Sequence, residues 1–128
     1  MNVAVTSKGN TIDSEVDPRF GRCRWFCIVN TDDMTFQAVQ NANASVGGGA
    51  GVQSGQLMAT HDVACVLTGN CGPNAFSTLE AADIQVITGV SGTVREAVEQ
   101  FKAQSLTPSS KANVARHYGT ASKDNEQG

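Results

Sequence analysis

Residues 63–75, VACVLTGNCGPNA, decide the class of fold that this chain adopts. The run 63–68 is continuously apolar up to its last residue, which is typical of a strand covered on both faces of a sheet. The glycines and the proline in residues 69–73 end this strand and start a helix. A buried strand, a glycine loop and a helix in that order are the building unit of α/β domains. The stretch therefore predicts an α/β fold.

The same unit recurs on both sides of this stretch. Short β-rich runs predict strands, and apolar residues three and four positions apart predict helices. The final helix is the clearest, because its apolar residues follow Val94 at i+3, i+4 and i+7 and because Thr93 and Glu96 form a capping box. The predicted strands are residues 2–6, 25–30, 35–40, 63–68 and 84–88, and the predicted helices are residues 52–61, a segment beginning near 73 and a segment beginning at 94.

The order of these elements predicts a five-stranded mixed sheet with helices on both faces. Residues 25–40 form a hairpin, so the second strand is antiparallel to the first and the third runs parallel to the first. Right-handed crossover helices then make the last two strands parallel to the first. The loops that follow the parallel strands meet at one edge, where ligands of open α/β sheets bind. These loops are residues 8–22, 47–49, 69–74 and 89–92.

Length and composition limit the class of protein. The chain has 128 residues, and we expect a single domain at residues 1–106 and a C-terminal segment at 107–128 that is disordered beyond about 118. No apolar run approaches the roughly 18 residues of a membrane span, and no secretory leader precedes the first strand. We therefore expect a cytoplasmic protein without a membrane anchor. The net charge of −3 gives no overall attraction to nucleic acid.

The basic residues are unevenly distributed and indicate an anion site. Four of the nine lysines and arginines lie in the first 24 residues, and residues 25–94 contain none. Glycine loops precede the helices, where backbone N–H groups and the helix dipole favour an anion. A micromolar complex requires about −8 kcal/mol, and a few hydrogen bonds to charged groups at roughly 1.5–3 kcal/mol each would supply it without covalent ligation. The predicted anion-binding residues are Lys8, Arg19, Phe20, Arg22, Gly48, Gly49, Gly72 and Asn74.

Cysteine ligation is the alternative mode of binding. The four cysteines, Cys23, Cys27, Cys65 and Cys71, form no CxxC pair and no zinc-type double pair, so we expect free thiols. Cys27 and Cys65 fall within strands and are expected in the core. Cys23 and Cys71 lie in loops of the predicted site, and with His117 they are the candidate metal ligands. A redox pair of Cys23 and Cys27 is disfavoured, since positions i and i+4 on one face of a strand lie about 13 Å apart.

No catalytic set accompanies this site, so we expect a binding protein and not an enzyme. The loops contain no carboxylate pair at strand ends and no Ser/His/Asp or Cys/His arrangement. The predicted topology also suits RNase H-like nucleases, which need metal-binding carboxylates on the central strands. The first strand offers Val3 and Val5 and no aspartate. Nuclease activity is therefore not expected.

Several motifs together resemble a known family. They are residues 16–23 (VDPRFGRC), 48–53 (GGAGVQ) and 68–75 (TGNCGPNA), followed by Asn113-Val114 and His117. Each motif alone is weak, but the combination is specific, and the similarity covers about residues 1–118. On these residues the chain resembles the dinitrogenase iron–molybdenum cofactor biosynthesis family.

This resemblance implies an RNase H-like three-layer α/β fold and the carriage or delivery of an anionic metal–sulfide cluster. The chain is similar to a short stand-alone form of the family that carries a mixed molybdenum–copper sulfide cluster without covalent attachment. That cluster is the expected cofactor, with an iron–molybdenum cofactor precursor as the alternative. MinD-type ATPases are implied as partners, because relatives act beside them. A cofactor-independent interaction or regulatory module that works with such an ATPase is the alternative function.

Overall fold

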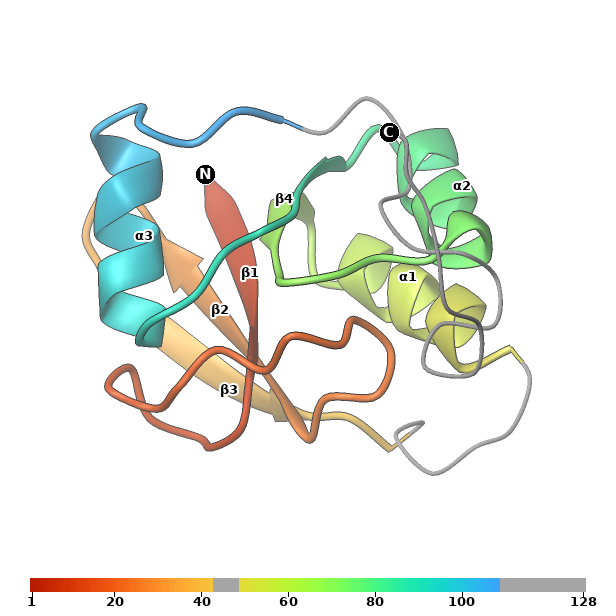
Figure 1. The fold of residues 1–128 in the computed structure, drawn as a ribbon, viewed down its shortest axis with the longest axis horizontal. Helices are drawn as coiled ribbons and strands as arrows, with labels where there is room; N and C mark the ends of the chain where they lie inside the picture. The colour runs from red at the N-terminus through yellow and green to blue at the C-terminus, as the bar shows by residue number, and fades with distance from the viewer. Residues whose placement is uncertain (43–48, 109–128) are drawn as a thin grey trace.

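Five strands and three helices make up the described part of the chain, residues 1–42 and 49–108 of a computed structural model (Figure 1). The strands are β1 (Asn2–Ser7), β2 (Trp25–Asn30), β3 (Phe36–Gln40), β4 (Val63–Leu67) and β5 (Gln85–Ile87), and the helices are α1 (Ala50–Thr60), α2 (Pro73–Ala81) and α3 (Val94–Lys102). The sheet has the order β3-β2-β1-β4-β5. The predicted disordered end of the chain lies outside the described residues. Within the two described ranges, no helix has the length and apolar content needed to cross a membrane.

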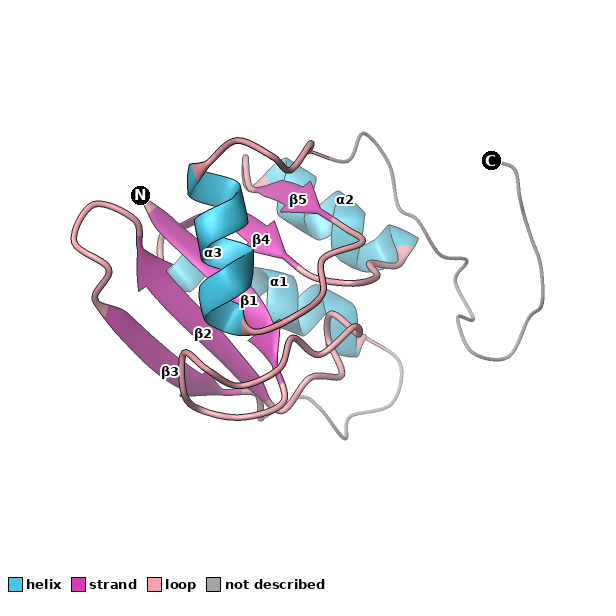
Figure 2. Cartoon of the chain, turned by 60° about the vertical axis from the view of Figure 1, so that its left-hand side comes forward, coloured by secondary structure: helices cyan, strands magenta, loops and turns pink. Residues whose placement is uncertain are grey.

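The strand directions confirm the predicted mixed sheet. β2 pairs antiparallel with β1 and with β3, whereas β4 pairs parallel with β1 and β5 pairs parallel with β4. Helix α3 covers one face of the sheet, and α1 and α2 pack against each other on the opposite face, which gives three layers (Figure 2). The carboxyl ends of β1, β3, β4 and β5 therefore meet at one edge, as the order of the elements predicted.

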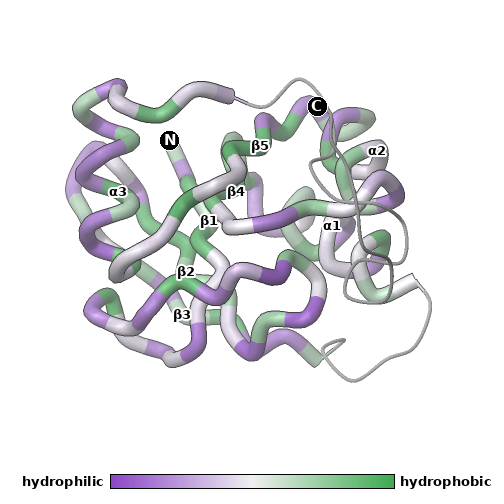
Figure 3. Tube along the Cα trace, in the orientation of Figure 1, coloured by the Kyte–Doolittle hydropathy of each residue, from purple (hydrophilic) through white to green (hydrophobic). Residues whose placement is uncertain are grey.

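Alternating side chains of the strands divide the core into two clusters, one on each face of the sheet. In β1, Val3 and Val5 belong to the cluster on the α3 side, and Ala4 belongs to the cluster on the side of α1 and α2. Residues of β4 contribute to both clusters, which confirms that this strand is covered on both faces. Figure 3 shows hydrophobic segments along the central strands and many hydrophilic residues in the long loop between β1 and β2.

The two cysteines near β2 lie in different clusters, and the expectation that they share one face of a strand is wrong. Cys27 belongs to the cluster on the α3 side, whereas Cys23 belongs to the cluster on the side of α1 and α2. The reason is that Cys23 precedes β2, so the two-residue alternation of a strand does not extend to it. All four cysteines are free thiols, as predicted, and Cys23 and Cys71 are buried as well as the two cysteines expected in the core. The sheet separates Cys23 from Cys27 and excludes a redox pair.

Element boundaries differ from the predicted ones by one or two residues. Helix α1 begins at Ala50 and not at 52, because Gly49 serves as its N-cap with a left-handed φ of 94° and accepts the first helical hydrogen bond, from Gln53 N. β5 ends at Ile87, because the backbone that follows it bonds to the loop after β4. These differences leave the predicted loops at the same edge.

Helices α1 and α2 end in a conformation that lowers the stability of the fold. The residue after each C-cap is an aspartate with a positive φ, 55° at Asp62 and 62° at Asp83. Glycine favours this left-handed conformation, which costs other residues roughly 1–2 kcal/mol. A carboxylate at a helix C-terminus also opposes the helix dipole. Both positions therefore combine backbone strain with an unfavourable charge.

Replacing Asp62 with glycine should stabilise the protein. We expect Asp62→Gly to raise the free energy of unfolding by about 1 kcal/mol, since it removes both the strain and the charge at the helix end. Asp62→Asn removes the charge alone and should give roughly half of that gain. Urea denaturation followed by circular dichroism measures both values. A glycine variant less stable than the native chain would mean that the Asp62 side chain makes a stabilising contact.

Candidate functional site

The long loop after β1 is attached to the carboxyl ends of the central strands by two buried threonines. The Thr6 hydroxyl donates to the Asp17 carbonyl oxygen at 2.6 Å, and the Asp17 amide donates to the Thr6 carbonyl oxygen at 2.9 Å. The hydroxyl oxygens of Thr6 and Thr68, at the ends of β1 and β4, share a hydrogen bond of 2.8 Å. All three residues are at most 3% exposed. This attachment fixes the start of residues 17–22, called the arginine segment below.

From this attachment the arginine segment lies along the loop that follows β4. Phe20 N donates to the carbonyl oxygen of Asn70 at 3.1 Å, and Arg19 forms a parallel backbone bridge with Asn70. Pro18 packs so closely on Gly69 that a Cβ atom at position 69 would lie 2.7 Å from Pro18 Cα. Only glycine at position 69 therefore leaves room for the arginine segment.

The arginine segment also contacts the N-terminus of α1, which in turn contacts the N-terminus of α2. Gly21 has a positive φ of 93°, and a Cβ atom there would lie 3.1 Å from Gly51 Cα. A Cβ atom at Gly51 would lie 2.9 Å from the Cβ atom of Ala75. The lack of side chains at these positions thus brings three separate segments into direct contact.

The N-termini of α1 and α2 leave backbone donors for a ligand. Their N-caps are Gly49 and Gly72, and glycine has no side chain to accept hydrogen bonds from the first-turn amides. Neither first turn contains an acidic residue. The amides and the positive ends of both helix dipoles therefore favour an anion. The first-turn donors are the amides of Ala50, Gly51, Val52, Asn74 and Ala75.

The N-terminus of α3 lies at the same edge but is occupied by the chain itself. Thr93 and Glu96 form the predicted capping box, in which the Glu96 amide donates to Thr93 Oγ1 at 3.1 Å and the Thr93 amide donates to Glu96 Oε1 at 2.9 Å. The amides of the first two residues of α3 donate to carbonyl oxygens of the loop after β1, at 2.9 and 2.8 Å. Of the three helices, only α1 and α2 therefore offer first-turn amides to a candidate anion site, and the loop at 89–92 does not contribute a helix N-terminus to it.

Two of the predicted cations are paired with carboxylates. Arg19 Nε lies 3.4 Å from Asp17 Oδ1, and Lys8 Nζ lies 3.4 Å from Glu15 Oε1. Both side chains of the Lys8 pair are more than half exposed, whereas the Asp17 side chain is only 5% exposed. A pair between exposed groups contributes little to stability. The Arg19 pair, in contrast, is built on a buried carboxylate.

Most of the predicted anion-binding residues lie in this region. Arg19, Phe20 and Arg22 are on the arginine segment, and Gly49, Gly72 and Asn74 are at the two helix N-termini. Lys8 lies outside it, paired with Glu15. Gly48 and the candidate ligand His117 lie outside the described residues.

The Phe20 ring packs into the core and anchors the arginine segment there. Phe20 is 7% exposed, and its ring centroid lies 5.6 Å from that of Phe26 in a tilted arrangement. An aromatic pair of this kind contributes about 0.5–1.5 kcal/mol beyond the area it buries. The ring therefore holds the neighbouring arginines at the surface and does not itself line that surface.

The residues that sequence reasoning missed are those that hold the segments together. Thr6 and Thr68 are polar residues at the ends of otherwise apolar strands, and this placement is the signal that could have found them. Asp17 is different, because its place beside the arginines suggests from the sequence alone that it could pair with one of them; only its burial had no signal. Gly51 and Ala75 belong to different helices, so no local pattern predicts their contact.

The two candidate thiol ligands are buried beneath this region. Cys23 is fully buried and Cys71 is 1% exposed, and both belong to the core cluster on the side of α1 and α2. Burial raises the pKa of both thiols to about 12, and the Asp17 carboxylate adds to the increase at Cys23. The thiolate, not the thiol, is the metal ligand. Among the described residues, no group of three His, Cys, Asp or Glu side chains is placed to hold a metal ion.

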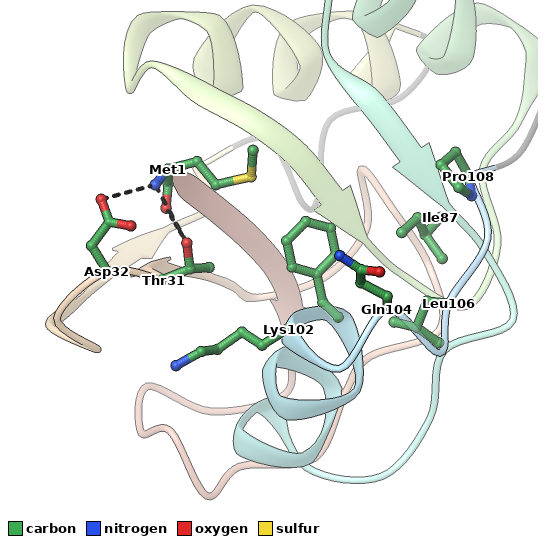
Figure 4. A pocket seen from close by; sticks show the side chains of 9 residues that line it. Met1, Thr31, Asp32, Ile87, Lys102, Gln104, Leu106 and Pro108 are labelled. Atoms are coloured by element: carbon green, nitrogen blue, oxygen red, sulfur yellow. Dashed lines mark hydrogen bonds and ion pairs between the residues drawn. The ribbon is translucent and has the colours of Figure 1, made fainter.

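A hollow of about 510 Å³ lies away from this region (Figure 4). Its walls are the N-terminus of β1, the β2–β3 turn, part of β5 and the C-terminal end of α3 with the residues that follow. The Met1 amino group lies 3.5 Å from Asp32 Oδ2 at its rim. Among the described residues, none of those predicted to bind an anion lines this hollow, so the candidate site remains at the carboxyl edge of the sheet.

Both the sequence and the fold match known proteins. The family model for the dinitrogenase iron–molybdenum cofactor matches residues 1–104. The apo form of the orange protein from Desulfovibrio gigas is 37% identical, with a TM-score of 0.86 and coverage of 88% of this chain and 95% of that one. A candidate NifB protein from Thermotoga is 34% identical, with a TM-score of 0.74 and coverage of 84% of this chain and 91% of that one. An uncharacterised protein of Methanocaldococcus jannaschii is 27% identical over 92 residues, which are 70% of this chain and 78% of that protein.

The buried thiols should resist alkylation in the native protein. At pH 8 a thiol with a pKa of about 12 is ionised in roughly one molecule in 10⁴, against roughly one in ten for the ordinary pKa of 9.0. We therefore expect native Cys23 and Cys71 to react with iodoacetamide on the order of 10³-fold more slowly than in the denatured chain. Mass spectrometry of the labelled peptides measures both rates. Native rates close to the denatured ones would contradict this burial.

Proposed function

Because the chain belongs to the dinitrogenase iron–molybdenum cofactor family, we propose that it binds and carries an anionic metal–sulfide cluster without covalent attachment. The observation that supports this most is the contact of the arginine segment with the N-terminus of α1, which itself packs against the N-terminus of α2, and both helices have glycine caps. A polyanionic cluster needs counter-charges and hydrogen-bond donors on the same side of the protein. This edge of the sheet supplies both.

Three kinds of interaction contribute to holding such a ligand. Each helix N-terminus carries about half a positive charge and contributes roughly 0.3–1 kcal/mol at an exposed site. Each amide hydrogen bond to a charged ligand contributes roughly 1.5–3 kcal/mol. Arg19 and Arg22 add full positive charges at the exposed rim. A few such contacts reach the roughly −8 kcal/mol of a micromolar complex before ordering costs are subtracted.

Each residue of the proposed site has a distinct role. Arg19 and Arg22 are the counter-charges, and Phe20 supports them from the core. Lys8 adds to the positive field from outside the arginine segment. The hydrogen-bond donors are the amides of Gly48, Gly49, Gly72 and Asn74, joined by those of Ala50 and Gly51 at the start of α1.

We propose a mixed molybdenum–copper sulfide cluster as the cargo, with an iron–molybdenum cofactor precursor as the alternative. The resemblance to the short stand-alone members of the family favours the first, and the family as a whole favours the second. The protein would act in the cytoplasm as a carrier and not as a catalyst. Val3 and Val5 of the central strand β1 lie in the core, where a metal-dependent nuclease would need carboxylates.

Removing the two arginines should weaken cluster binding. Mixing apo-protein with tetrathiomolybdate and copper should give a new charge-transfer absorption that co-elutes with the protein. In the Arg19→Ala/Arg22→Ala variant we expect the affinity to fall at least about tenfold, since two charge-assisted contacts are lost. Arg95→Ala is the matched control, because Arg95 lies on α3, where its Nε is 2.9 Å from Asp13 Oδ1. This variant should keep the absorption. Unchanged affinity in the double variant would place the site elsewhere.

The same absorption distinguishes the two modes of binding. A cluster held without covalent bonds should bind equally well to Cys23→Ser and Cys71→Ser, because serine keeps the size of the side chain and removes the sulfur. Loss of the absorption in either variant, or in His117→Ala, would identify a ligand. Elemental analysis of the protein purified without oxygen identifies the metals.

A second function, an interaction or regulatory module that needs no cofactor, is favoured by the opposite edge of the sheet. Exposed carboxylates follow α1 and α2 and occupy the β2–β3 turn, at Asp62, Asp83, Asp32 and Asp33. A basic partner surface would be attracted to this edge. We propose a MinD-type ATPase as the partner of such a module.

A pull-down of a MinD-type ATPase by the immobilised protein tests this second function. A cofactor-independent module should retain the ATPase equally in its apo and cluster-loaded forms, and Asp62→Asn/Asp83→Asn should retain less, because it removes two exposed charges. Retention by the loaded form alone would instead support delivery of the cluster. No retention by either form would contradict the partnership.

A further inference from the structure

A buried carboxylate lies beside Arg19, close to the proposed anion site. Asp17 is 3% exposed. Burying a carboxylate is unfavourable unless it is paired and hydrogen-bonded. A negative charge near an anion site also weakens binding by repulsion. Asp17 is therefore expected to make a favourable contribution that outweighs the cost of its burial and its repulsion of an anion.

The hydrogen bonds of this carboxylate show which groups it keeps in position. Asp17 Oδ1 accepts hydrogen bonds from the Arg19 amide at 3.0 Å and from Arg19 Nε at 3.4 Å. The Arg19 side chain is 54% exposed, so the pair joins the packed loop to the surface. One carboxylate oxygen thus contacts both the backbone and the side chain of Arg19.

The use of Nε leaves the rest of the guanidinium for a ligand. Only one N–H group of arginine is on Nε, and the others are on the terminal nitrogens Nη1 and Nη2. These terminal nitrogens form a planar fork that matches two acceptor atoms of one ligand. Lysine has a single nitrogen and no equivalent of Nε. A carboxylate that paired with a lysine here would therefore use the same nitrogen that has to bind the ligand.

The backbone of Asp17 is itself fixed before any ligand arrives. It bonds to Thr6 in both directions, at 2.6 and 2.9 Å, and the following Pro18 packs against Gly69. A donor group that is already ordered loses less conformational freedom on binding. The carboxylate therefore offers Arg19 a rigid support.

We propose that Asp17 is a positioning residue of the anion site, which holds Arg19 through Nε so that its terminal nitrogens bind the ligand. The inference rests on the proposed function, because it states how one residue of that site is prepared. The effect of Asp17 on anion binding is then the opposite of what its negative charge alone would cause. Removing this charge weakens the binding of an anion, although the repulsion is relieved.

The Asp17→Asn variant tests whether removing the charge weakens or strengthens anion binding. The variant keeps the size of the side chain and the bonds to Thr6, which are made by backbone atoms of Asp17. With tetrathiomolybdate and copper as the probe, we expect the affinity to fall roughly 3- to 10-fold, because the ion pair with Arg19 becomes a weaker hydrogen bond to an uncharged amide oxygen. Asp13→Asn is the matched control, since it removes the same charge from the same loop, and its affinity should stay within about twofold. Unchanged or tighter binding in Asp17→Asn overturns the proposal.

A double-mutant cycle with Arg19→Ala separates positioning from a general effect on the loop. If Asp17 acts through Arg19, then Asp17→Asn should change the affinity of the Arg19→Ala protein by less than about twofold. Arg19→Lys should bind the probe nearly as weakly as Arg19→Ala, because its charge is no longer held. A full effect of Asp17→Asn in the absence of Arg19 would overturn the positioning role.

A measurement without ligand keeps this inference distinct from the proposed function. The Arg19 Nε–H proton should give a resolved NMR signal that exchanges slowly with water in the native protein and in Asp13→Asn, and its exchange should be markedly faster in Asp17→Asn. Failure of the native protein to bind the probe would refute the proposed function. An Nε–H signal that is the same in Asp17→Asn would refute the positioning role alone.

Discussion

The hydrogen bonds of Thr6 are the constraint on which the candidate site depends. They join three parts of the chain that are distant in sequence: β1, the arginine segment through Asp17, and β4 through Thr68. All three residues are buried, so water does not compete for these bonds, and the low dielectric of the interior strengthens them. The backbone positions of the exposed arginines are therefore fixed by groups in the core.

The three helices use their N-termini in two different ways. The first turn of α3 is satisfied by its capping box and by carbonyl groups of the loop after β1, so α3 holds that loop against the sheet. The caps of α1 and α2 are glycines, which leave the first-turn amides for another partner. A capping side chain typically adds about 1 kcal/mol of stability. Its absence from two adjacent helices places the proposed binding function in α1 and α2 and the structural function in α3.

The topology and the edge that bears the site could be predicted, because both follow from local patterns. The hairpin and the glycine loops determine the strand directions, and these determine which loops meet. The capping box of α3 is local as well. Contacts between distant segments leave no such pattern, which is why the occupation of the α3 N-terminus, the burial of Asp17 and the inward position of Phe20 were not predicted. Cys23 was assigned to the wrong face because strand alternation was extended to residues that precede the start of β2.

The contact between Gly51 and Ala75 has a consequence for the size of the ligand. The two helices approach as closely as their backbones permit, because Gly51 has no Cβ atom and Ala75 has no side chain beyond it. The separation between the two sets of amides therefore limits the diameter of an anion that can touch both. A single added methyl group at position 51 would push the helices apart and widen this gap without changing any charge or donor.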